Sequence, residues 1–337
     1  MISIEKLKQV KRLITHANCP DGYASALIVK DALPDVEVLF VKHGTEEHRA
    51  LEPRPGDLFC DFSPHIKSWD ASREGEDDCV RHPLQLKHWL EAGTIVLDHH
   101  PTQRDVTMLF VKAGLGAYGE NDRNECGAWL AYEHVWKPLR DANEWNEIKN
   151  SVHEFAELAG IRDTWKKHDE RWQEACWQAE ALMFWGNDAL TLGIEKTMST
   201  VGSLGPVLFD KKVESANNAL KEAHPFVTKK GTLVHVFQGV YTTSDAAEIL
   251  EKSQKEKFGK AMTDIVAGFH YRVDADKLQL TFSTRSHSGY DVGAFCKAHG
   301  GGGHTAAAGF TVEQSAEVGS NPYAVFRCLL EEWETEP

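Results

Sequence analysis

Imidazole and carboxylate side chains follow three apolar runs of the sequence, at the points where these runs end. The clearest run is "IVLDHHPT", in which a segment typical of a buried strand ends in Asp98-His99-His100. Asp61 follows "DLFC", and His16 follows "RLIT". Loops at the carboxyl ends of parallel strands converge on one crevice, so we expect these side chains to meet there. The alternative for "DHH", taken alone, is a solvated loop with an incidental pair of imidazoles.

Further ligand-type residues extend this group. Asn18 and Asp21 lie in "ANCPD" directly after His16, and Asp163 follows the helical run "AELAGIR". Carboxylates and imidazoles together suit hard or borderline cations such as Mn²⁺. Two such ions, bridged by one carboxylate and a water-derived hydroxide, would provide a nucleophile for attack on phosphorus. A single zinc ion is a weaker alternative, because five or six candidate ligands are too many for four-coordinate zinc.

A second group of residues, in "GGGGHTAAAGF" near the carboxyl end, is suited to an anion. Consecutive glycines let backbone N–H groups approach an anion closely, and His304 would project beside them. Upstream, "STRSHSG" supplies Arg285, a bidentate phosphate donor. The alternative is that four glycines after a helix form only a flexible helix stop.

The elements that would position the first group alternate between strand and helix. Helices are predicted at 21–33 and at 83–93, the second with Pro near its start and Gly beyond its end. The polar segment 68–78 is expected to be a loop, and the strand at 36–41 to be buried on both faces. Strands are predicted at 11–15, 36–41, 56–61, 94–98 and 107–112. This alternation predicts an α/β fold with a mostly parallel, doubly wound sheet.

The rest of the sequence predicts a helical segment and a second, smaller α/β domain. Residues 125–200 are helical in pattern and rich in Trp, which indicates core packing more than base stacking. A strand at 231–239, a helix at 245–258, a hairpin turning at 274–277 and a final helix at 322–333 follow. The predicted domains are 1–200 for metal binding and catalysis, 201–228 as a linking helical region, and 229–337 for substrate binding.

Composition and charge limit the classes of function. The formal charge of −14 argues against a protein that grips long duplex nucleic acid through its phosphates. Residues 226–312 hold 10 Lys/Arg and 8 Asp/Glu, which leaves 27 and 43 for the remainder. The sequence contains no membrane-length apolar stretch and no secretory signal, and its seven scattered Cys suit reduced thiols. We therefore expect a cytoplasmic protein.

Together these motifs resemble those of the DHH phosphoesterases that carry a DHH-associated C-terminal domain. This superfamily includes oligoribonucleases, phosphoadenosine-phosphate phosphatases and RecJ-like enzymes. The resemblance covers most of the chain and rests on these residues in this order: His16, Asn18, Asp21-Gly22, Asp61, Asp98-His99-His100, Asp163, Arg285-Ser286, Gly301-Gly302-Gly303-His304 and Ala307-Ala308-Gly309. Many relatives have Asp where this chain has Asn18, and the "CPDG" spacing differs from the common Asp-x-Asp. An amide oxygen brings no charge, so the neighbouring ion would be held more weakly.

The resemblance implies a role for each matching residue. His16 and Asp21 would bind different Mn²⁺ ions, Asp61 would bridge them, and His99 and Asp163 would complete the second. Asp98 would be a ligand or support one, and His100 would orient ligands or contact the scissile phosphate. Residues of the second domain would hold the substrate's phosphate or terminal nucleotide across a cleft: Arg285, Ser286, Gly301, Gly302, Gly303 and His304.

We therefore expect a phosphoesterase that uses two Mn²⁺ ions, with Mg²⁺ or Co²⁺ as substitutes, on short oligonucleotides or small nucleotides. The alternatives are a RecJ-like single-strand exonuclease, a phosphodiesterase of cyclic or linear dinucleotides, and a non-catalytic nucleotide-binding regulator that has lost one metal. Asn18 is the only feature that favours the regulator. The sequence is also compatible with a homodimer, and no membrane partner is expected.

Overall fold

The computed structural model describes residues 2–42, 45–66, 84–140, 147–239, 242–274, 277–313 and 321–335. It divides into two compact units, Met1–Phe209 and Asp210–Pro337. The predicted loop at 68–78 lies outside the described residues.

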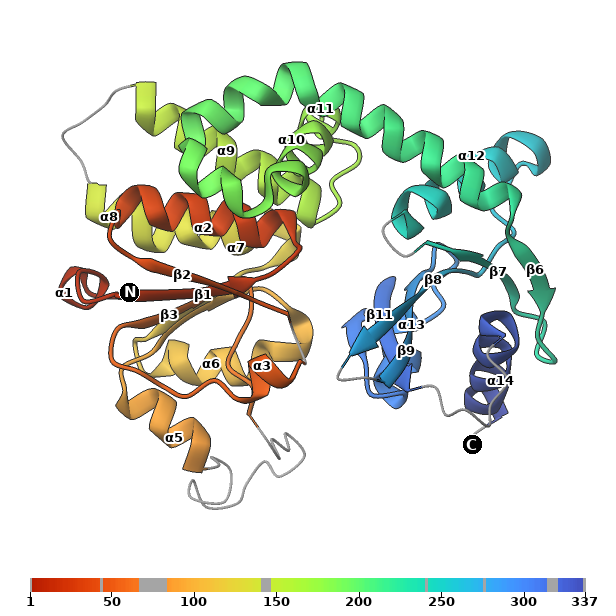
Figure 1. Cartoon of the computed structure of the whole chain (residues 1–337), viewed down its shortest axis with the longest axis horizontal. Coiled ribbons are helices and arrows are strands. Elements are labelled where there is room, and N and C mark those ends of the chain that lie inside the picture. Colours follow the sequence, from red (N-terminus) through yellow and green to blue (C-terminus); the bar gives the residue numbers. More distant parts are fainter. Residues whose placement is uncertain are drawn as a thin grey trace. The chain divides into compact units, whose positions relative to one another are not determined.

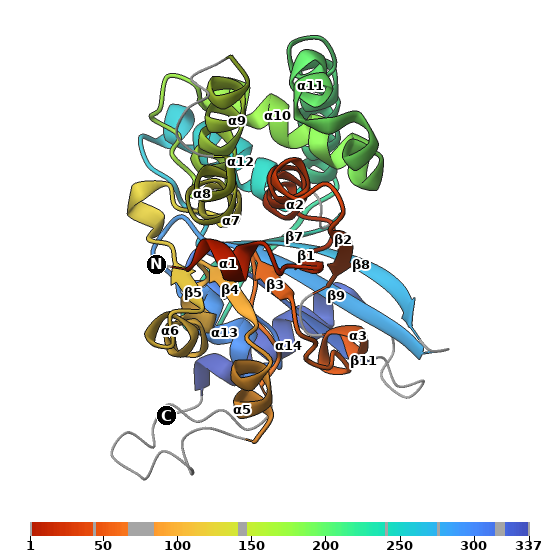
Figure 2. The ribbon, with the colours of Figure 1, turned by 90° about the vertical axis from the view of Figure 1, so that its left-hand side faces the viewer.

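The first unit is built on a five-stranded sheet in which every pair of neighbouring strands is parallel, in the order β2-β1-β3-β4-β5. Figure 2 shows helices on both faces of this sheet, with α2, α7, α8 and α9 on one and α3, α5 and α6 on the other. The prediction of a doubly wound α/β sheet is confirmed. The strands are β1 (Arg12–His16), β2 (Glu37–Val41), β3 (Asp57–Cys60), β4 (Ile95–Asp98) and β5 (Gly116–Tyr118).

Helices make up most of the remainder of this unit. A π-helical turn, Tyr132–Trp136, joins α7 to α8. The helices are α1 (Ile4–Leu7), α2 (Pro20–Ala32), α3 (Glu46–Arg49), α5 (Leu84–Glu91), α6 (Arg104–Lys112), α7 (Gly127–Ala131), α8 (Lys137–Arg140), α9 (Glu147–Asp163), α10 (Trp172–Trp185) and α11 (Ala189–Lys221). The predicted core role of the Trp-rich region is confirmed for Trp136, which is 5% exposed, and for Trp129 and Trp172, which pack against buried clusters.

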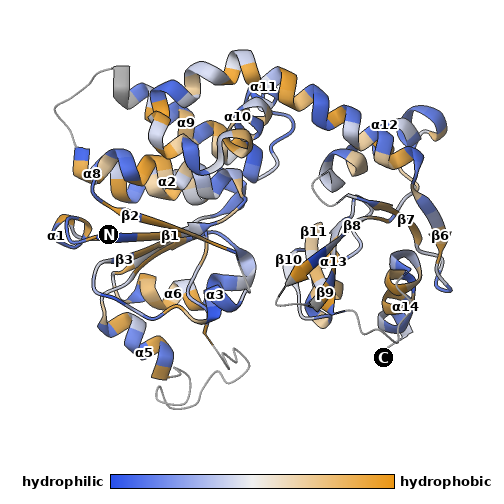
Figure 3. Ribbon diagram, in the orientation of Figure 1, coloured by the Kyte–Doolittle hydropathy of each residue, from blue (hydrophilic) through white to orange (hydrophobic). Residues whose placement is uncertain are grey.

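Alternation along the strands places one hydrophobic core on each face of the sheet. Leu13 and Leu58 pack towards α2 and α7, whereas the next residues, Ile14 and Phe59, pack towards α5 and α6. Successive side chains of a strand point to opposite faces, which explains why these strands are apolar throughout. The hydrophobic colouring of Figure 3 follows these strands.

Two sequence-based expectations for this unit were wrong. Residues 107–112 are not a strand but part of α6, because Val106 and Phe110 lie one helical turn apart and both are buried. The fifth strand is instead β5, which begins at Gly116. Strand β2 is not buried on both faces: it lies at the sheet edge, where only Val41 is fully buried.

The second unit has a six-stranded sheet in the order β10-β11-β9-β8-β7-β6, and only the β7–β8 pair is parallel. The predicted hairpin is confirmed, since β8 and β9 are antiparallel. The strands are β6 (His224–Val227), β7 (Leu233–Gln238), β8 (Ile265–Asp274), β9 (Lys277–Arg285), β10 (Gly302–His304) and β11 (Ala307–Glu313), and the helices are α12 (Thr243–Phe258), α13 (Val292–Ala298) and α14 (Pro322–Thr335).

Helix α11 runs across the boundary between the two units without an intervening loop (Figure 1). A Cβ at Gly205 would lie 2.5 Å from Cβ of Trp177 on α10, so this part of the helix packs closely on the first unit. Ala216, further along, is fully buried in a cluster with Phe237 of the second unit. Pro206 lies between these two contacts.

Candidate metal centre

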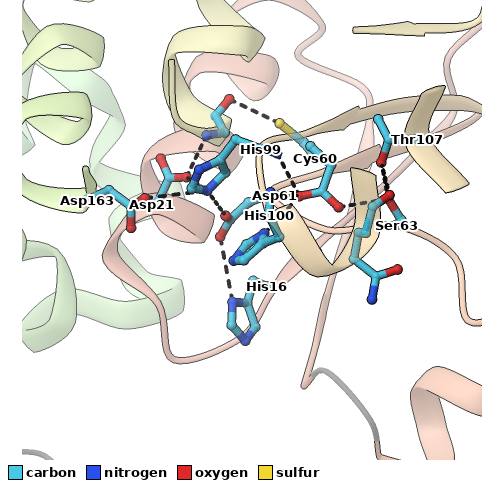
Figure 4. A network of polar contacts seen from close by, with 12 residues as sticks. His16, Asp21, Cys60, Asp61, Ser63, His99, His100, Thr107 and Asp163 are labelled. Atoms are coloured by element: carbon cyan, nitrogen blue, oxygen red, sulfur yellow. Dashed lines mark hydrogen bonds and ion pairs between the residues drawn. The ribbon is translucent and has the colours of Figure 1, made fainter. Parts of the chain in front are cut away.

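The carboxyl ends of β1, β3 and β4 bring most of the predicted ligand residues together (Figure 4). Within the described part of the chain, three groups of side chains have ligand atoms within 4.8 Å of one another. These groups are His16, Cys19 and Asp61; Asp61, His99 and His100; and Asp21, His99 and Asp163. The first and second groups share Asp61, and the second and third share His99.

His99 lies at the middle of the cluster and is 2% exposed. Its Nε2 lies 3.3 Å from Oδ1 of Asp61, 3.4 Å from Oδ2 of Asp163 and 3.7 Å from Oδ2 of Asp21. Its Nδ1 lies 2.9 Å from Oδ1 of Asn121, an outer partner that sequence reasoning missed. When Nδ1 donates to this amide oxygen, the neutral ring presents the Nε2 lone pair to the carboxylate cluster, as metal-ligating histidines do.

Asp61 carries a buried carboxylate oxygen that lacks a hydrogen-bond partner. The residue is 1% exposed, and its Oδ2 has no such partner, although Nδ1 of His16 lies 3.7 Å away. Burial, and next the charge of Asp21, raises the pKa of Asp61 well above its ordinary value. A buried anion without full compensation is unfavourable, and a bound cation would remove the penalty. These residues therefore fit a divalent ion.

The backbone around Asp61 is specialised for this position. Asp61 itself has a left-handed φ of 66°. A Cβ added at Gly127 would lie 2.6 Å from Cβ of Asp61 and 2.8 Å from Oδ2 of Asp21, so only glycine fits there. The first turn of α7 is thereby packed directly against two of the candidate ligands.

Asp21 is held by the amino end of α7. Its Oδ2 accepts a hydrogen bond from Gly127 N at 2.6 Å, and its Oδ1 accepts one from Ala128 N at 2.8 Å. These amides belong to the first turn of a helix, where N–H groups have no partner within the helix. The contact fixes the carboxylate beside His99.

Asp98 and His100 form a supporting layer around the cluster. Oδ1 of Asp98 accepts hydrogen bonds from the backbone N of His99 at 2.8 Å and of His100 at 3.1 Å, and lies 2.8 Å from Nδ1 of His100. Its Oδ2 accepts a bond from Ser63 Oγ at 2.7 Å, and that hydroxyl lies 2.8 Å from Thr107 Oγ1. Both oxygens of Asp98 are therefore engaged by the protein.

Charges in this layer shift the pKa values of both partners. Burial would raise the pKa of Asp98, but His100 and the surrounding hydrogen bonds outweigh it and lower that pKa to about 2. Burial would lower the pKa of His100, but Asp98 and then Asp163 outweigh it and raise that pKa to about 9. For His99, burial and His100 act downward, yet Asp163, Asp61 and Asp21 raise its pKa to about 9. The ion-free cluster thus holds protons that a cation would replace.

Asn18 and Cys19 differ in position. Asn18 is exposed and has a left-handed φ of 57°. It lines a cleft of about 420 Å³ together with Ala17, Tyr23, Phe40, Trp185, Asn187 and Asp188. The Sγ of Cys19, which the sequence argument did not consider as a ligand, lies within 4.8 Å of a ring nitrogen of His16 and an oxygen of Asp61.

Two of the predicted phosphate-holding residues of the second unit, Arg285 and His304, lie in one row of its sheet. His304 on β10 is opposite Ala307 on β11, which is opposite Arg285 on β9. Directly opposed residues of antiparallel strands share a face, so His304 and Arg285 flank the small Ala307. Their backbones are two strand spacings apart, roughly 9–10 Å. The guanidinium of Arg285 is fixed by Nε–H donation to Ser244 Oγ at 2.8 Å.

The glycines beside this row have distinct roles. A Cβ at Gly301 would overlap the carbonyl oxygen of Gly309, and Gly303 has a φ of 139°, so both positions need glycine for the pairing of β10 with β11. A Cβ at Gly302 would meet nothing within 4 Å. Ser286 is 6% exposed and its Oγ has no hydrogen-bond partner, while its N–H donates to Ala306 O.

Comparison with solved structures assigns the fold. The DHH domain of a protein described as a member of a family of ribosomal proteins matches with a TM-score of 0.57 and 12% identity, covering 98% of this chain and 88% of that one. This chain has the DHH-domain fold. No family model and no curated protein sequence matches the chain.

Two further structures align with this DHH-fold chain at lower TM-scores. The pGpG-specific phosphodiesterase PggH from Vibrio cholerae aligns at 13% identity and a TM-score of 0.47, over 97% of this chain and 100% of that one. RecJ from Thermus thermophilus, in complex with Mn²⁺, aligns at 17% identity and a TM-score of 0.46, over 99% of this chain and 53% of RecJ.

Among the described helices, each is too short or too polar to cross a membrane.

Proposed function

We propose that this protein is a metal-dependent phosphoesterase that hydrolyses phosphodiester bonds of short oligonucleotides or small nucleotides. The observation that carries this proposal is the buried Oδ2 of Asp61, which lacks a hydrogen-bond partner between the imidazoles of His16 and His99. Two divalent cations, Mn²⁺ in the first instance, would supply an activated water as nucleophile and neutralise charge on the phosphoryl oxygens.

The protein's own residues would divide the remaining tasks. Asp61 would bridge the two cation positions, with His16 on one side and with Asp21, His99 and Asp163 on the other. His100, fixed by Asp98, would donate a hydrogen bond to a phosphoryl oxygen. Such a fixed donor favours charge that develops in the transition state.

The cleft beside His16 favours a nucleotide over an inorganic phosphate chain. Ala17 and Asn18, which follow His16 directly, line it together with the aromatic side chains of Tyr23, Phe40 and Trp185. Aromatic faces stack on bases, and Asn187 and Asp188 provide polar atoms for base edges. A polyphosphate chain has no apolar face to bury there.

In the second unit, the row of His304, Ala307 and Arg285 is suited to one phosphate group. An arginine and an imidazole on either side of a methyl group offer N–H donors to an anion, and the backbone at Gly302 is open to close approach. We propose that Arg285, Ser286, His304 and Gly301–Gly303 hold the substrate's terminal phosphate.

A substrate panel tests the proposal. Chelator-treated protein should be inactive and should recover best with Mn²⁺, on a panel of di- to decanucleotides, cyclic dinucleotides and phosphoadenosine phosphate. The Asp61→Asn variant should be inactive with every ion, because a charged bridge is lost. Full activity of chelator-treated protein would contradict the proposal.

A further inference from the structure

The thiol of Cys19 lies where an additional ligand of the first cation position is expected. Its Sγ, a ring nitrogen of His16 and a carboxylate oxygen of Asp61 lie within 4.8 Å of one another. Cys19 is the N-cap residue of α2, yet its side chain makes no capping hydrogen bond. Burial, and next the charges of Asp61, Asp163 and Asp21, raise the pKa of the Cys19 thiol well above its ordinary value, while a hydrogen bond with the backbone of Gly22 acts in the other direction.

Asp61 provides a second and independent indication of a ligand at this place. Its Oδ2 is without a hydrogen-bond partner although the residue is 1% exposed. Another cysteine near the cluster differs: Cys60 is fully buried, and its Sγ donates to Gly127 O at 3.3 Å. Cys19 is only half-buried, so an ion can reach it from solvent.

The backbone explains why Cys19, and not Asn18, faces this position. Asn18 has a left-handed φ of 57°, which asparagine tolerates better than most residues. The chain turns there, so the Asn18 side chain lines the aromatic cleft while the next residue lies beside His16 and Asp61. An Asn18 ligand would bring no charge to the first cation position. A Cys19 thiolate would bring a negative charge there.

We propose that Cys19 is a thiolate ligand of the first cation position, with His16 and Asp61, and that Zn²⁺ and Co²⁺ bind this position more tightly than the neighbouring one. Thiolate is a soft ligand and imidazole a borderline one, whereas the neighbouring position of Asp21, His99 and Asp163 is richer in hard oxygen ligands. On binding, the thiol proton leaves to solvent and the sulfur lone pair forms the bond to the metal. This inference rests on the metal centre of the proposed function.

Cobalt spectroscopy on the full chain tests the assignment. We expect Co²⁺ added to chelator-treated protein to produce the near-ultraviolet charge-transfer absorption of a Co²⁺–thiolate bond. The band should be absent from Cys19→Ser and unchanged in the matched control Cys328→Ser, whose thiol is exposed on α14. Zn²⁺ affinity, measured by competition with a chromophoric chelator, should fall at least about tenfold in Cys19→Ser. Loss of a residue that only supports a metal ligand already lowers metal affinity by about tenfold or more. Mn²⁺ affinity should change less.

Two results would overturn the assignment. One is wild-type protein that binds Co²⁺ stoichiometrically by equilibrium dialysis without the charge-transfer band, a result that needs no variant to fold. The other is a Cys19→Ser variant that keeps the band. Hydrolysis without a thiolate band would refute only the role of Cys19, whereas a thiolate band in a protein that hydrolyses nothing on the panel would refute only the proposed activity.

Discussion

The Asp61→Asn variant should be more stable than the wild-type protein in chelator and less stable than it with Mn²⁺. In the ion-free state, the buried Oδ2 of Asp61 is without a hydrogen-bond partner and lies near the carboxylate of Asp21. Two like charges about 4 Å apart repel each other by about 1 kcal/mol even in bulk water. The neutral amide keeps an acceptor for His99 and removes this repulsion, so the free energy of unfolding should rise by about 1 kcal/mol in chelator.

With Mn²⁺ the order should be the opposite. A ligand at about 100 times its Kd stabilises the folded state by about 2.7 kcal/mol, and wild-type protein should gain this amount. The variant has lost the bridging carboxylate and should gain little. The two denaturation curves should therefore exchange places when Mn²⁺ replaces chelator.

Tryptophan fluorescence during urea unfolding is the appropriate assay. Nine of the ten Trp residues precede residue 210, so the signal reports on the first unit. Asp57→Asn is the matched control, because Asp57 is buried but fully paired with Arg12 through two contacts of 2.8 Å. The same chemical change there should lower stability by about 3–5 kcal/mol. A variant of Asp61 that is destabilised in chelator and still gains as much from Mn²⁺ as the wild type would refute the reasoning.

Three further outcomes are expected for catalysis. Arg285→Ala and His304→Ala should raise KM more than they lower kcat, whereas Asp163→Ala should mainly lower kcat. If steady-state kinetics gave the same pattern for both sets, substrate binding and catalysis would not be divided between the two groups of residues. Trp185→Leu should raise KM for a dinucleotide by the equivalent of about 1–3 kcal/mol, and the control Cys328→Ser should leave KM unchanged. An unchanged KM in Trp185→Leu would exclude base stacking on this side chain. Catalytic efficiency on single strands should peak at about two to five nucleotides with a shallow salt dependence, since a groove that tracks a strand has a slope of roughly 0.7 per phosphate. Efficiency that rises beyond about ten nucleotides with a steep slope would favour the exonuclease.

The sequence was sufficient to predict the sheet and the edge at which the ligand-type residues meet. Asp61 and Asp98-His99-His100 are adjacent to strand ends, and parallel order then brings them together. The strand predicted at 107–112 was wrong because a short apolar run carries no period that separates strand from helix. Only the helix places Thr107 Oγ1 beside Ser63, where it supports Asp98 indirectly.

Other parts of the candidate site leave no local signal. Asn121 lies in a 3-10 turn (Asn121–Arg123), and its contact with His99 joins residues 22 positions apart. The amides of Gly127 and Ala128 bind Asp21 across more than 100 residues. In the sequence alone, nothing distinguishes Cys19 from the other six cysteines. The turn at Asn18 is what places Cys19 beside His16 and Asp61. Such contacts depend on tertiary packing, which hydrophobic periodicity does not specify.

Helix α11, which is kinked at Gly193, has a second irregular point at Pro206. Proline has no N–H, so Pro206 leaves the carbonyl of Gly202 without its usual helical partner. This weak point lies between the close contact of Gly205 with Trp177 and the buried Ala216, each of which fixes one end. A missing hydrogen bond makes a helix easier to bend at that place than within a regular turn.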